Sequence, residues 1–328
     1  MTEKICVART NLWINPVFDR LLSENENIDL KIIDVHAPQE QWHRVLSEAD
    51  YYHVSAAKDE LPAGLFVSEA LLAHCPKLKG VSSSGAGYDT IDVAACNKKN
   101  ITVVNQAGGN ANSVAEMALG LALAVSRRIV ESDRTLVAQN AGSREALMGH
   151  EVFGKTLGLI GLGHIGTRFA QMGTALGMDV LAYDPYLTDQ DVELRHARNT
   201  PLEQLLAKSD IVSLHCPLNN ETRNMFDANR FGQMKKGAIF ISTARGGIHN
   251  EEDLYAALQR GHLAGAGLDV WKVEPPKPDN PLLGHERVVA TFHTAGVSHE
   301  CRYNVAQMAA QQILLMADGK PPLHVVHA

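Results

Sequence analysis

Short hydrophobic runs alternate along the chain with segments whose apolar residues recur at helical spacing. In the first hundred residues the runs predict strands at Lys4–Ala8, Ile28–Ile33, Tyr51–Val54, Leu78–Ser82 and Ile101–Val104. The segments between them predict helices at Pro16–Leu22, Gln39–Ser47, Ser68–Ala73 and Asp92–Lys98. Because strands that alternate with helices build parallel sheets, the pattern predicts an α/β fold.

A second alternating series extends from Thr156 to Ala290. It predicts a helix at Thr167–Leu176 and strands at Thr156–Ile160, Asp179–Tyr183, Ile211–Leu214, Ala238–Ile241, Gly265–Leu268 and Val288–Ala290. Between the two series, Ser113 and Glu116 have the spacing of a capping box and predict a long helix from there to about Val130. A last helix is predicted at His299–Ala317. At 328 residues and roughly 150 residues per domain, we expect two doubly wound α/β units.

Gly161, Gly163 and Gly166 follow the first strand of the second series in the order GxGxxG, and a helix follows them. In such a loop the first glycine makes a tight turn, the second admits a pyrophosphate, and the third lets the helix pack on the strand. Phosphate oxygens then bind the N–H groups at the helix N-terminus. The motif predicts a dinucleotide site, with plain turn formation as the alternative.

Asp184 ends the next strand, about twenty residues after the loop, where an acidic side chain holds the ribose hydroxyls of NAD. A carboxylate there repels the 2′-phosphate of NADP, and no arginine follows among Pro185, Tyr186 and Leu187 to compensate. We therefore expect NAD as the cofactor.

Three later strands of the second series end in residues suited to carbonyl chemistry: Arg245, Asp269 with Glu274, and His293. Ligands of doubly wound sheets bind outside the carboxyl ends of the strands, so these side chains are expected at one edge. A guanidinium clamps a carboxylate and polarises a carbonyl, and an imidazole beside a carboxylate exchanges a proton near neutral pH. Arg245 and His293 fit these two roles, with Glu274 as the partner of the histidine.

Composition excludes several classes of protein. The net charge is −7 with no Lys/Arg-rich block, so no nucleic-acid partner is expected, and no apolar run reaches the ~18 residues of a membrane span. The five cysteines are scattered and the histidines lack ligand spacing, so neither disulfides nor a metal site is expected. The amino-terminal residues lack the pattern of a secretory signal, which predicts a cytoplasmic protein.

Taken together, the segments GLGHIG, SLHCPLNNETRNMF, STARGG, LDVWKVEP and FHTAG resemble the D-isomer-specific 2-hydroxyacid dehydrogenase family along nearly the whole chain. The resemblance implies a Rossmann NAD domain, residues 108–295, inserted in a flavodoxin-like substrate domain, residues 1–107 and 296–328. It also implies a homodimer and catalysis in the cleft between the domains.

The resemblance assigns roles by motif. Arg245 binds and polarises the 2-oxo acid, His293 is the acid/base, Glu274 is its partner, and Asp269 faces the nicotinamide. Ala86 and Gly87, in the run Ser84–Asp89, hold the substrate carboxylate with backbone N–H groups. The cofactor contacts implied are Gly161, Gly163, His164, Ile165, Gly166, Asp184, His215, Cys216, Pro217, Thr222, Thr243, Ala244, Asp269 and His293.

The loop after Tyr51–Val54 lacks the arginines that phosphoglycerate-type members use for a phosphate, so a phosphorylated substrate is not expected. Tyr52, His53 and Lys58 are candidates for the substrate's variable end, with surface positions as the alternative. The expected reaction is reversible reduction of a small 2-oxo acid, such as glyoxylate or hydroxypyruvate or a larger one, to the D-2-hydroxy acid. Two alternatives stay open: an NAD-sensing dimeric binding protein resembling the C-terminal-binding-protein corepressors, and an enzyme that oxidises phosphite.

Overall fold

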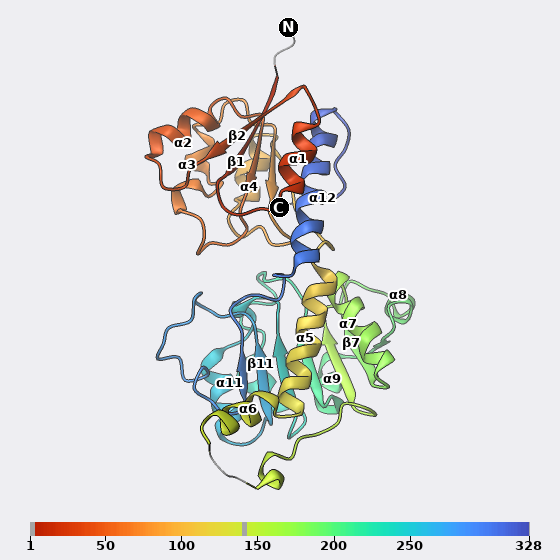
Figure 1. Ribbon diagram of the computed structural model, residues 1–328. Coiled ribbons are helices and arrows are strands. Elements are labelled where there is room, and N and C mark those ends of the chain that lie inside the picture. Colours follow the sequence, from red (N-terminus) through yellow and green to blue (C-terminus); the bar gives the residue numbers. More distant parts are fainter. Residues whose placement is uncertain (1–3, 140–142, 328) are drawn as a thin grey trace. The chain divides into compact units, whose positions relative to one another are not determined.

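The computed structural model describes residues 4–139 and 143–327. The chain divides into two compact units: the first is Met1–Asn110 with Val297–Ala328, and the second is Ala111–Gly296. The second unit is thus inserted between two segments of the first. Each unit has one parallel sheet with helices on both faces (Figure 1), which confirms the predicted α/β class.

The first unit has a five-stranded sheet in the order β2-β1-β3-β4-β5. This is the flavodoxin-like order, in which the order of the parallel strands reverses between β1 and β3. The strands are β1 (Ile5–Thr10), β2 (Ile28–Ile33), β3 (Tyr51–Val54), β4 (Gly80–Ser83) and β5 (Thr102–Val104). The helices are α1 (Val17–Ser23), α2 (Gln39–Leu46), η1 (Ala63–Leu65), α3 (Glu69–Leu72), α4 (Val93–Lys98) and α12 (His299–Ala317).

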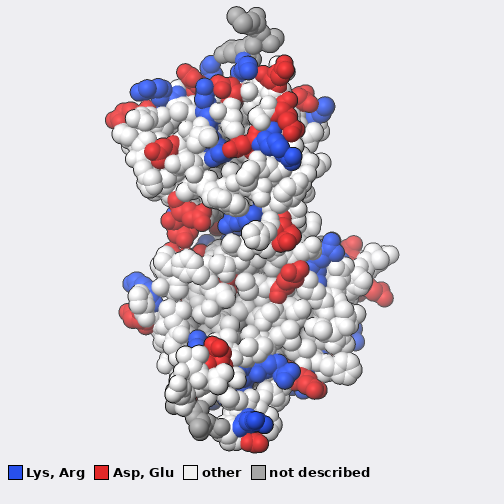
Figure 2. Space-filling model, in the orientation of Figure 1, with Lys and Arg blue, Asp and Glu red and all other residues white. Residues whose placement is uncertain are grey.

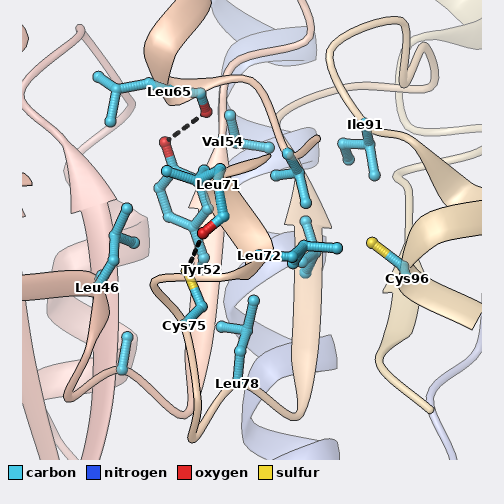
Figure 3. Packing of buried hydrophobic residues seen from close by; sticks show 14 of the residues in the cluster. Leu46, Tyr52, Val54, Leu65, Leu71, Leu72, Cys75, Leu78, Ile91 and Cys96 are labelled. Atoms are coloured by element: carbon cyan, nitrogen blue, oxygen red, sulfur yellow. Dashed lines mark hydrogen bonds between the residues drawn. The ribbon is translucent and has the colours of Figure 1, made fainter. Parts of the chain in front are cut away.

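The two faces of the first sheet bury different clusters. On one face α2, α3 and α4 cover a core that includes Leu46, Leu72 and Tyr52. Figure 3 shows the Tyr52 hydroxyl donating to the carbonyl of Leu65 within this core, at 3.3 Å. On the other face α12 packs beside α1 (Figure 1), so the last long helix covers one face of a sheet whose strands all lie in the first 104 residues. Because successive strand residues face opposite sides, Tyr52 enters the first core and His53 faces α1.

The second unit has a seven-stranded sheet in the order β12-β11-β10-β9-β6-β7-β8, and its reversal lies between β6 and β9. The strands are β6 (Thr156–Ile160), β7 (Asp179–Tyr183), β8 (Arg198–Asn199), β9 (Ile211–Leu214), β10 (Ile239–Ser242), β11 (Gly265–Leu268) and β12 (Val288–Ala290). The helices are α5 (Ala111–Ser126), α6 (Ile129–Val137), η2 (Arg144–Leu147), α7 (His164–Ala175), α8 (Asp189–Leu194), α9 (Leu202–Lys208), α10 (Ala228–Gln233), η3 (Gly246–Ile248) and α11 (Glu251–Gln259). The two-residue edge strand β8 was not expected from the sequence.

The long connecting helix differs from its prediction. The capping box placed its start at Ser113, but α5 begins at Ala111, so Ser113 lies inside the first turn. The helix ends at Ser126 instead of near Val130, because Arg128 adopts a left-handed conformation with φ 54° before α6. A side-chain pattern fixes a helix end weakly when neighbouring residues also favour helix.

Candidate active site

The glycine loop stands at the reversal of the second sheet, between β6 and α7. Gly161 has φ +88°, and a Cβ there would lie 2.7 Å from the backbone nitrogen of Cys216. A Cβ on Gly166 would lie 2.3 Å from the carbonyl oxygen of Gly161, whereas one on Gly163 would meet no atom within 4 Å. The outer glycines therefore serve the turn and the helix packing, while the middle one leaves open space for a phosphate at the start of α7.

Asp184 couples the loop to the end of β7. Its Oδ2 accepts a hydrogen bond from the N–H of Leu162 at 2.9 Å, and its Oδ1 accepts one from the N–H of Tyr186 at 3.1 Å. Each carboxylate oxygen retains a further lone pair for a hydroxyl donor. The sequence did not indicate that this carboxylate also holds the glycine loop in place.

The other expected cofactor residues lie after neighbouring strands of the same sheet. His164 and Ile165 form the first turn of α7, His215, Cys216 and Pro217 follow β9, and Thr243 and Ala244 follow β10. Burial lowers the pKa of His215 to about 3, so its ring is neutral; Nε2 contacts Ser213 Oγ at 2.9 Å. The Thr222 hydroxyl shapes its own loop, since it donates to the Pro217 carbonyl at 2.6 Å, and its contact with the cofactor stays a prediction.

Arg245 follows β10 in extended conformation, directly before Gly246. A Cβ on Gly246 would lie 2.0 Å from the carbonyl carbon of Trp271, so only glycine permits this close approach of two strand-end loops. The Arg245 guanidinium donates to the carbonyl of Ala244 at 2.7 Å and is near enough for its charge to lower the pKa values of His293 and Glu274. The loop that carries Arg245 therefore lies directly against the loop that carries Trp271 and Glu274.

His293 and Glu274 form a hydrogen-bonded pair. His293 Nδ1 lies 2.8 Å from Glu274 Oε2, and the other carboxylate oxygen accepts from the N–H of Trp271 at 3.0 Å. Side-chain exposure is 45% for His293 and 29% for Glu274, so the imidazole reaches solvent while its partner is more enclosed. This arrangement fixes the ring orientation and directs Nε2 away from the carboxylate.

The pair shifts the pKa values of both members in opposite directions. The hydrogen bond to Glu274 and its charge raise the pKa of His293, against burial and the charge of Arg245. Burial favours a raised pKa for Glu274, but the hydrogen bonds from His293 and from the Trp271 N–H, with the nearby positive charges, bring it below its usual range. Both shifts favour an imidazolium beside a carboxylate near neutral pH.

Asp269 is fully buried, and its carboxylate holds the histidine loop. It accepts hydrogen bonds from the Thr291 hydroxyl at 2.6 Å and from the N–H groups of Thr294 and Ala295 at 2.8 and 2.9 Å. His293, held between these anchors, has φ 46°, an unfavourable conformation for a residue with a Cβ. The contacts of Asp269 thus position His293, and its expected place beside the nicotinamide stays a prediction. Nothing in the sequence indicated the parts of Thr291 and the Trp271 N–H.

The Ser84–Asp89 loop follows β4 in the first unit. Its carbonyl groups point back into the unit: Gly85 accepts from the N–H of Gln106 at 2.9 Å, Ala86 accepts from Asn105 Nδ2 at 2.8 Å, and Gly87 accepts from the Ser83 hydroxyl. Among the described residues, the N–H groups of Gly85, Ala86 and Gly87 have no hydrogen-bond acceptor. Consecutive unpaired N–H groups suit an anion such as a carboxylate.

A glycine loop at the reversal of a doubly wound sheet, with arginine, glutamate and histidine at later strand ends of the same sheet, is typical of the NAD-binding domain of an oxidoreductase. Residues 119–295 match the family model of the D-isomer specific 2-hydroxyacid dehydrogenase NAD binding domain. The chain belongs to this family, which confirms the expected family and cofactor.

Three relatives show how far the similarity extends. The chain is 40% identical over 261 residues to a D-3-phosphoglycerate dehydrogenase of Archaeoglobus fulgidus. The matched region is 80% of this chain and 49% of that one, so this chain spans about half of that relative's length. It is 34% identical to a hydroxypyruvate reductase of Thermotoga maritima, over 94% of this chain and 98% of that one. The crystal structure of an Aquifex aeolicus D-lactate dehydrogenase with NAD and lactic acid has a TM-score of 0.80 and 29% identity, over 95% and 96% of the chains.

Proposed function

We propose that this protein interconverts a small 2-oxo acid and the corresponding D-2-hydroxy acid, with NAD as redox partner. The observation that carries the proposal is the Glu274–His293 pair held at the same sheet edge as Arg245 and the glycine loop. The imidazole of this pair is solvent-accessible, and the carboxylate raises its pKa, which suits proton transfer near neutral pH.

The residues of this chain divide the work. The N–H groups of Ala86 and Gly87 hold the substrate carboxylate, Arg245 polarises the 2-oxo group, and His293 gives its proton to the carbonyl oxygen during reduction. In oxidation His293 takes the same proton back. Glu274 keeps the imidazole charged, and Asp269 keeps it in place. Bound NADH supplies the hydride, and Gly161, Gly163 and Asp184 are the residues that would hold it.

The test is the loss of NADH absorbance with a panel of 2-oxo acids, and the gain with phosphite and NAD. Turnover of a 2-oxo acid to a product of D configuration supports the proposal. Tight NADH binding without turnover of any 2-oxo acid would refute it and favour the NAD-sensing protein, while turnover of phosphite alone would favour that alternative.

We also propose a homodimer. Helix α6 has no buried residue, and it exposes Ile129, Leu136 and Val137 to 55, 79 and 76%; Met148 and Phe153 add further exposed apolar surface in the same unit. Apolar surface of this extent on one part of a chain is typical of an interface, here with a second copy. Light scattering after Leu136→Glu and Val137→Glu tests this: a monomer is expected, and an unchanged mass would contradict the interface.

No helix among the described residues is long and apolar enough to cross a membrane, and the same residues contain no cluster of three potential metal ligands. Acidic and basic side chains are interspersed on the face shown in Figure 2. We propose a cytoplasmic location, since Cys6, Cys75, Cys96 and Cys216 form no disulfide and the first three of them are buried.

A further inference from the structure

A cavity of about 40 Å³ lies wholly within the first unit. Arg9 and Thr10 at the end of β1 line it, as do His53 and Ser55 at the end of β3, so it stands at the reversal of the flavodoxin-like sheet. Ligands of doubly wound sheets bind at this position. Ser84 also lines the cavity and begins the loop whose N–H groups we assign to the substrate carboxylate. The cavity therefore adjoins that loop.

A buried chain of hydrogen bonds sets the proton position on His53. The N–H of His324 donates to Gln312 Oε1 at 2.9 Å, so Gln312 Nε2 donates to Gln106 Oε1 at 2.8 Å. Gln106 Nε2 must then donate to Ser82 Oγ, at 3.2 Å. Ser82 Oγ lies 3.1 Å from His53 Nδ1, and the described residues offer its proton no other acceptor. His53 consequently carries its own proton on Nε2.

His53 is thus a neutral donor. It is 4% exposed, burial and the charge of Arg9 lower its pKa to about 3, and its Nε2 has no partner among the described residues. A buried N–H group without an acceptor is costly unless a ligand or water supplies one. His53, unlike Tyr52 in the core or exposed Lys58, is therefore the one of the three early candidates that lines a cavity.

The rest of the lining is also rich in free donors. Asn15 Oδ1 accepts from the N–H of Val17 at 3.1 Å, which leaves its Nδ2 protons, and Ser84 Oγ accepts from the N–H of Ala56 at 3.0 Å, which leaves its hydroxyl proton. Arg302 on α12 lies over the Trp13 ring, 6.0 Å from its centroid, and forms no ion pair with any acid that the structure describes.

The lining has two other charged residues, Arg9 and Glu60. Arg9 is neutralised by a bidentate pair with Asp19, at 2.7 and 2.5 Å. Glu60 is the one acid in the lining; it is exposed and accepts from the Ser55 hydroxyl at 3.4 Å. The interior of the cavity therefore presents donors and one uncompensated guanidinium.

The size of the cavity limits the ligand. Roughly 10–15 Å³ of such volume holds one water molecule, so the space suits about three or four heavy atoms. A carboxylate or sulfonate fits this number, and a phenyl ring does not. Resting on the proposed function, we infer that the cavity receives the substituent of the 2-oxo acid, and that the favoured substrates are short 2-oxo acids with a second anionic group, which binds Arg302 and His53.

The experiment compares kcat/KM for 2-oxosuccinate and 3-sulfopyruvate with that for 2-oxobutyrate, which has a similar length but no charge on its substituent. We expect the wild-type protein to favour the dianions, and the preferred one of the two identifies carboxylate or sulfonate. Arg302→Gln should reduce the preference roughly tenfold to a hundredfold, the range for a lost charged hydrogen bond, whereas Arg302→Lys should retain part of it. Arg44→Gln, on the exposed side of α2, is the matched control and should change nothing.

Glu60→Gln should act in the opposite direction and raise kcat/KM for the dianions, by up to roughly fivefold, because an exposed like charge is removed. A gain cannot arise from misfolding. The tautomer is read independently from the imidazole nitrogen shifts of His53, which should show a protonated Nε2 in the wild-type protein and a changed distribution in Ser82→Ala.

The outcomes separate the two proposals. Turnover of 2-oxobutyrate that equals or exceeds turnover of both dianions would overturn the inference and leave the proposed function intact. If no 2-oxo acid is reduced, the proposed function fails; calorimetry with D-malate then tests the cavity directly, and absence of binding, or equal binding by wild type and Arg302→Gln, overturns the inference as well.

Discussion

The carboxyl edges of the two sheets hold polar groups in opposite ways. At the edge of the second unit, the imidazole of His293 is accessible, its pKa is raised by Glu274, and a buried carboxylate keeps its backbone in a strained conformation. At the edge of the first unit, His53 is buried, neutral and oriented by a series of amides and a hydroxyl. The first arrangement suits proton transfer and the second suits recognition, so substitutions at the two edges should affect different kinetic constants.

The largest expected effect is at the proton-transfer edge. His293→Asn removes the acid/base, and we expect kcat to fall about 10²–10⁴-fold for every substrate, since general acid–base catalysis contributes about that much. NADH binding, measured by fluorescence, should persist because the glycine loop is untouched. His299→Asn, an exposed histidine at the start of α12, is the control. Loss of NADH binding together with kcat would contradict the assigned role.

Two further substitutions each remove a side chain whose hydrogen bonds position the histidine at one of the two edges. In Asp269→Asn the amide cannot accept on both arms, so one N–H of the Thr294–Ala295 pair loses its acceptor. In Gln312→Leu the relay to His53 is interrupted. Each change leaves buried polar groups unpaired and should reduce the free energy of unfolding by about 1–3 kcal/mol, measured by urea denaturation.

The kinetic consequences of these two variants should differ. Asp269→Asn should lower kcat because His293 loses its position, whereas Gln312→Leu should mainly raise KM. If both variants changed only stability, or both changed the same constant, the proposed division between the two edges would be wrong.

The sequence predicted the regular parts of the fold and the residues of the reaction, but not the contacts that position them. Strands such as Ile28–Ile33 and Gly265–Leu268 were predicted with their observed bounds because buried parallel strands are continuous apolar runs between turn residues. The glycine loop and the ends of β10, β11 and β12 followed from local motifs. The partners of Asp269 and the relay from His324 to His53 join residues far apart in the chain, and no local pattern encodes such pairings.

A third prediction concerns the cofactor loop, which has no counterpart in the first unit. Asp184→Ala removes both the acceptor for ribose hydroxyls and the hydrogen bond from the Leu162 N–H. We expect weaker NADH binding and a smaller preference for NADH over NADPH, by roughly tenfold, the size of one charged hydrogen bond. The ratio of kcat/KM for the two cofactors measures this. An unchanged ratio would assign Asp184 to holding the loop alone.

The smallest effect is a displaced pH dependence. Reduction needs protonated His293, so kcat/KM falls as pH rises through the pKa of His293, which Glu274 raises above its ordinary value of 6.5. Glu274→Gln removes the charge and the strong acceptor, so the falling limb should move to lower pH while the rate at acidic pH changes less. Because Glu274 raises the pKa of His293 in the folded protein, the pair stabilises the fold fully below the pKa of this histidine in the unfolded chain. This stabilisation is lost as pH rises through the pKa of the folded state. His53 is neutral between pH 6 and 8, so its titration should not change the preference for dianionic substrates in this range. A limb that stays in place in Glu274→Gln would show that the proton required for reduction does not reside on His293.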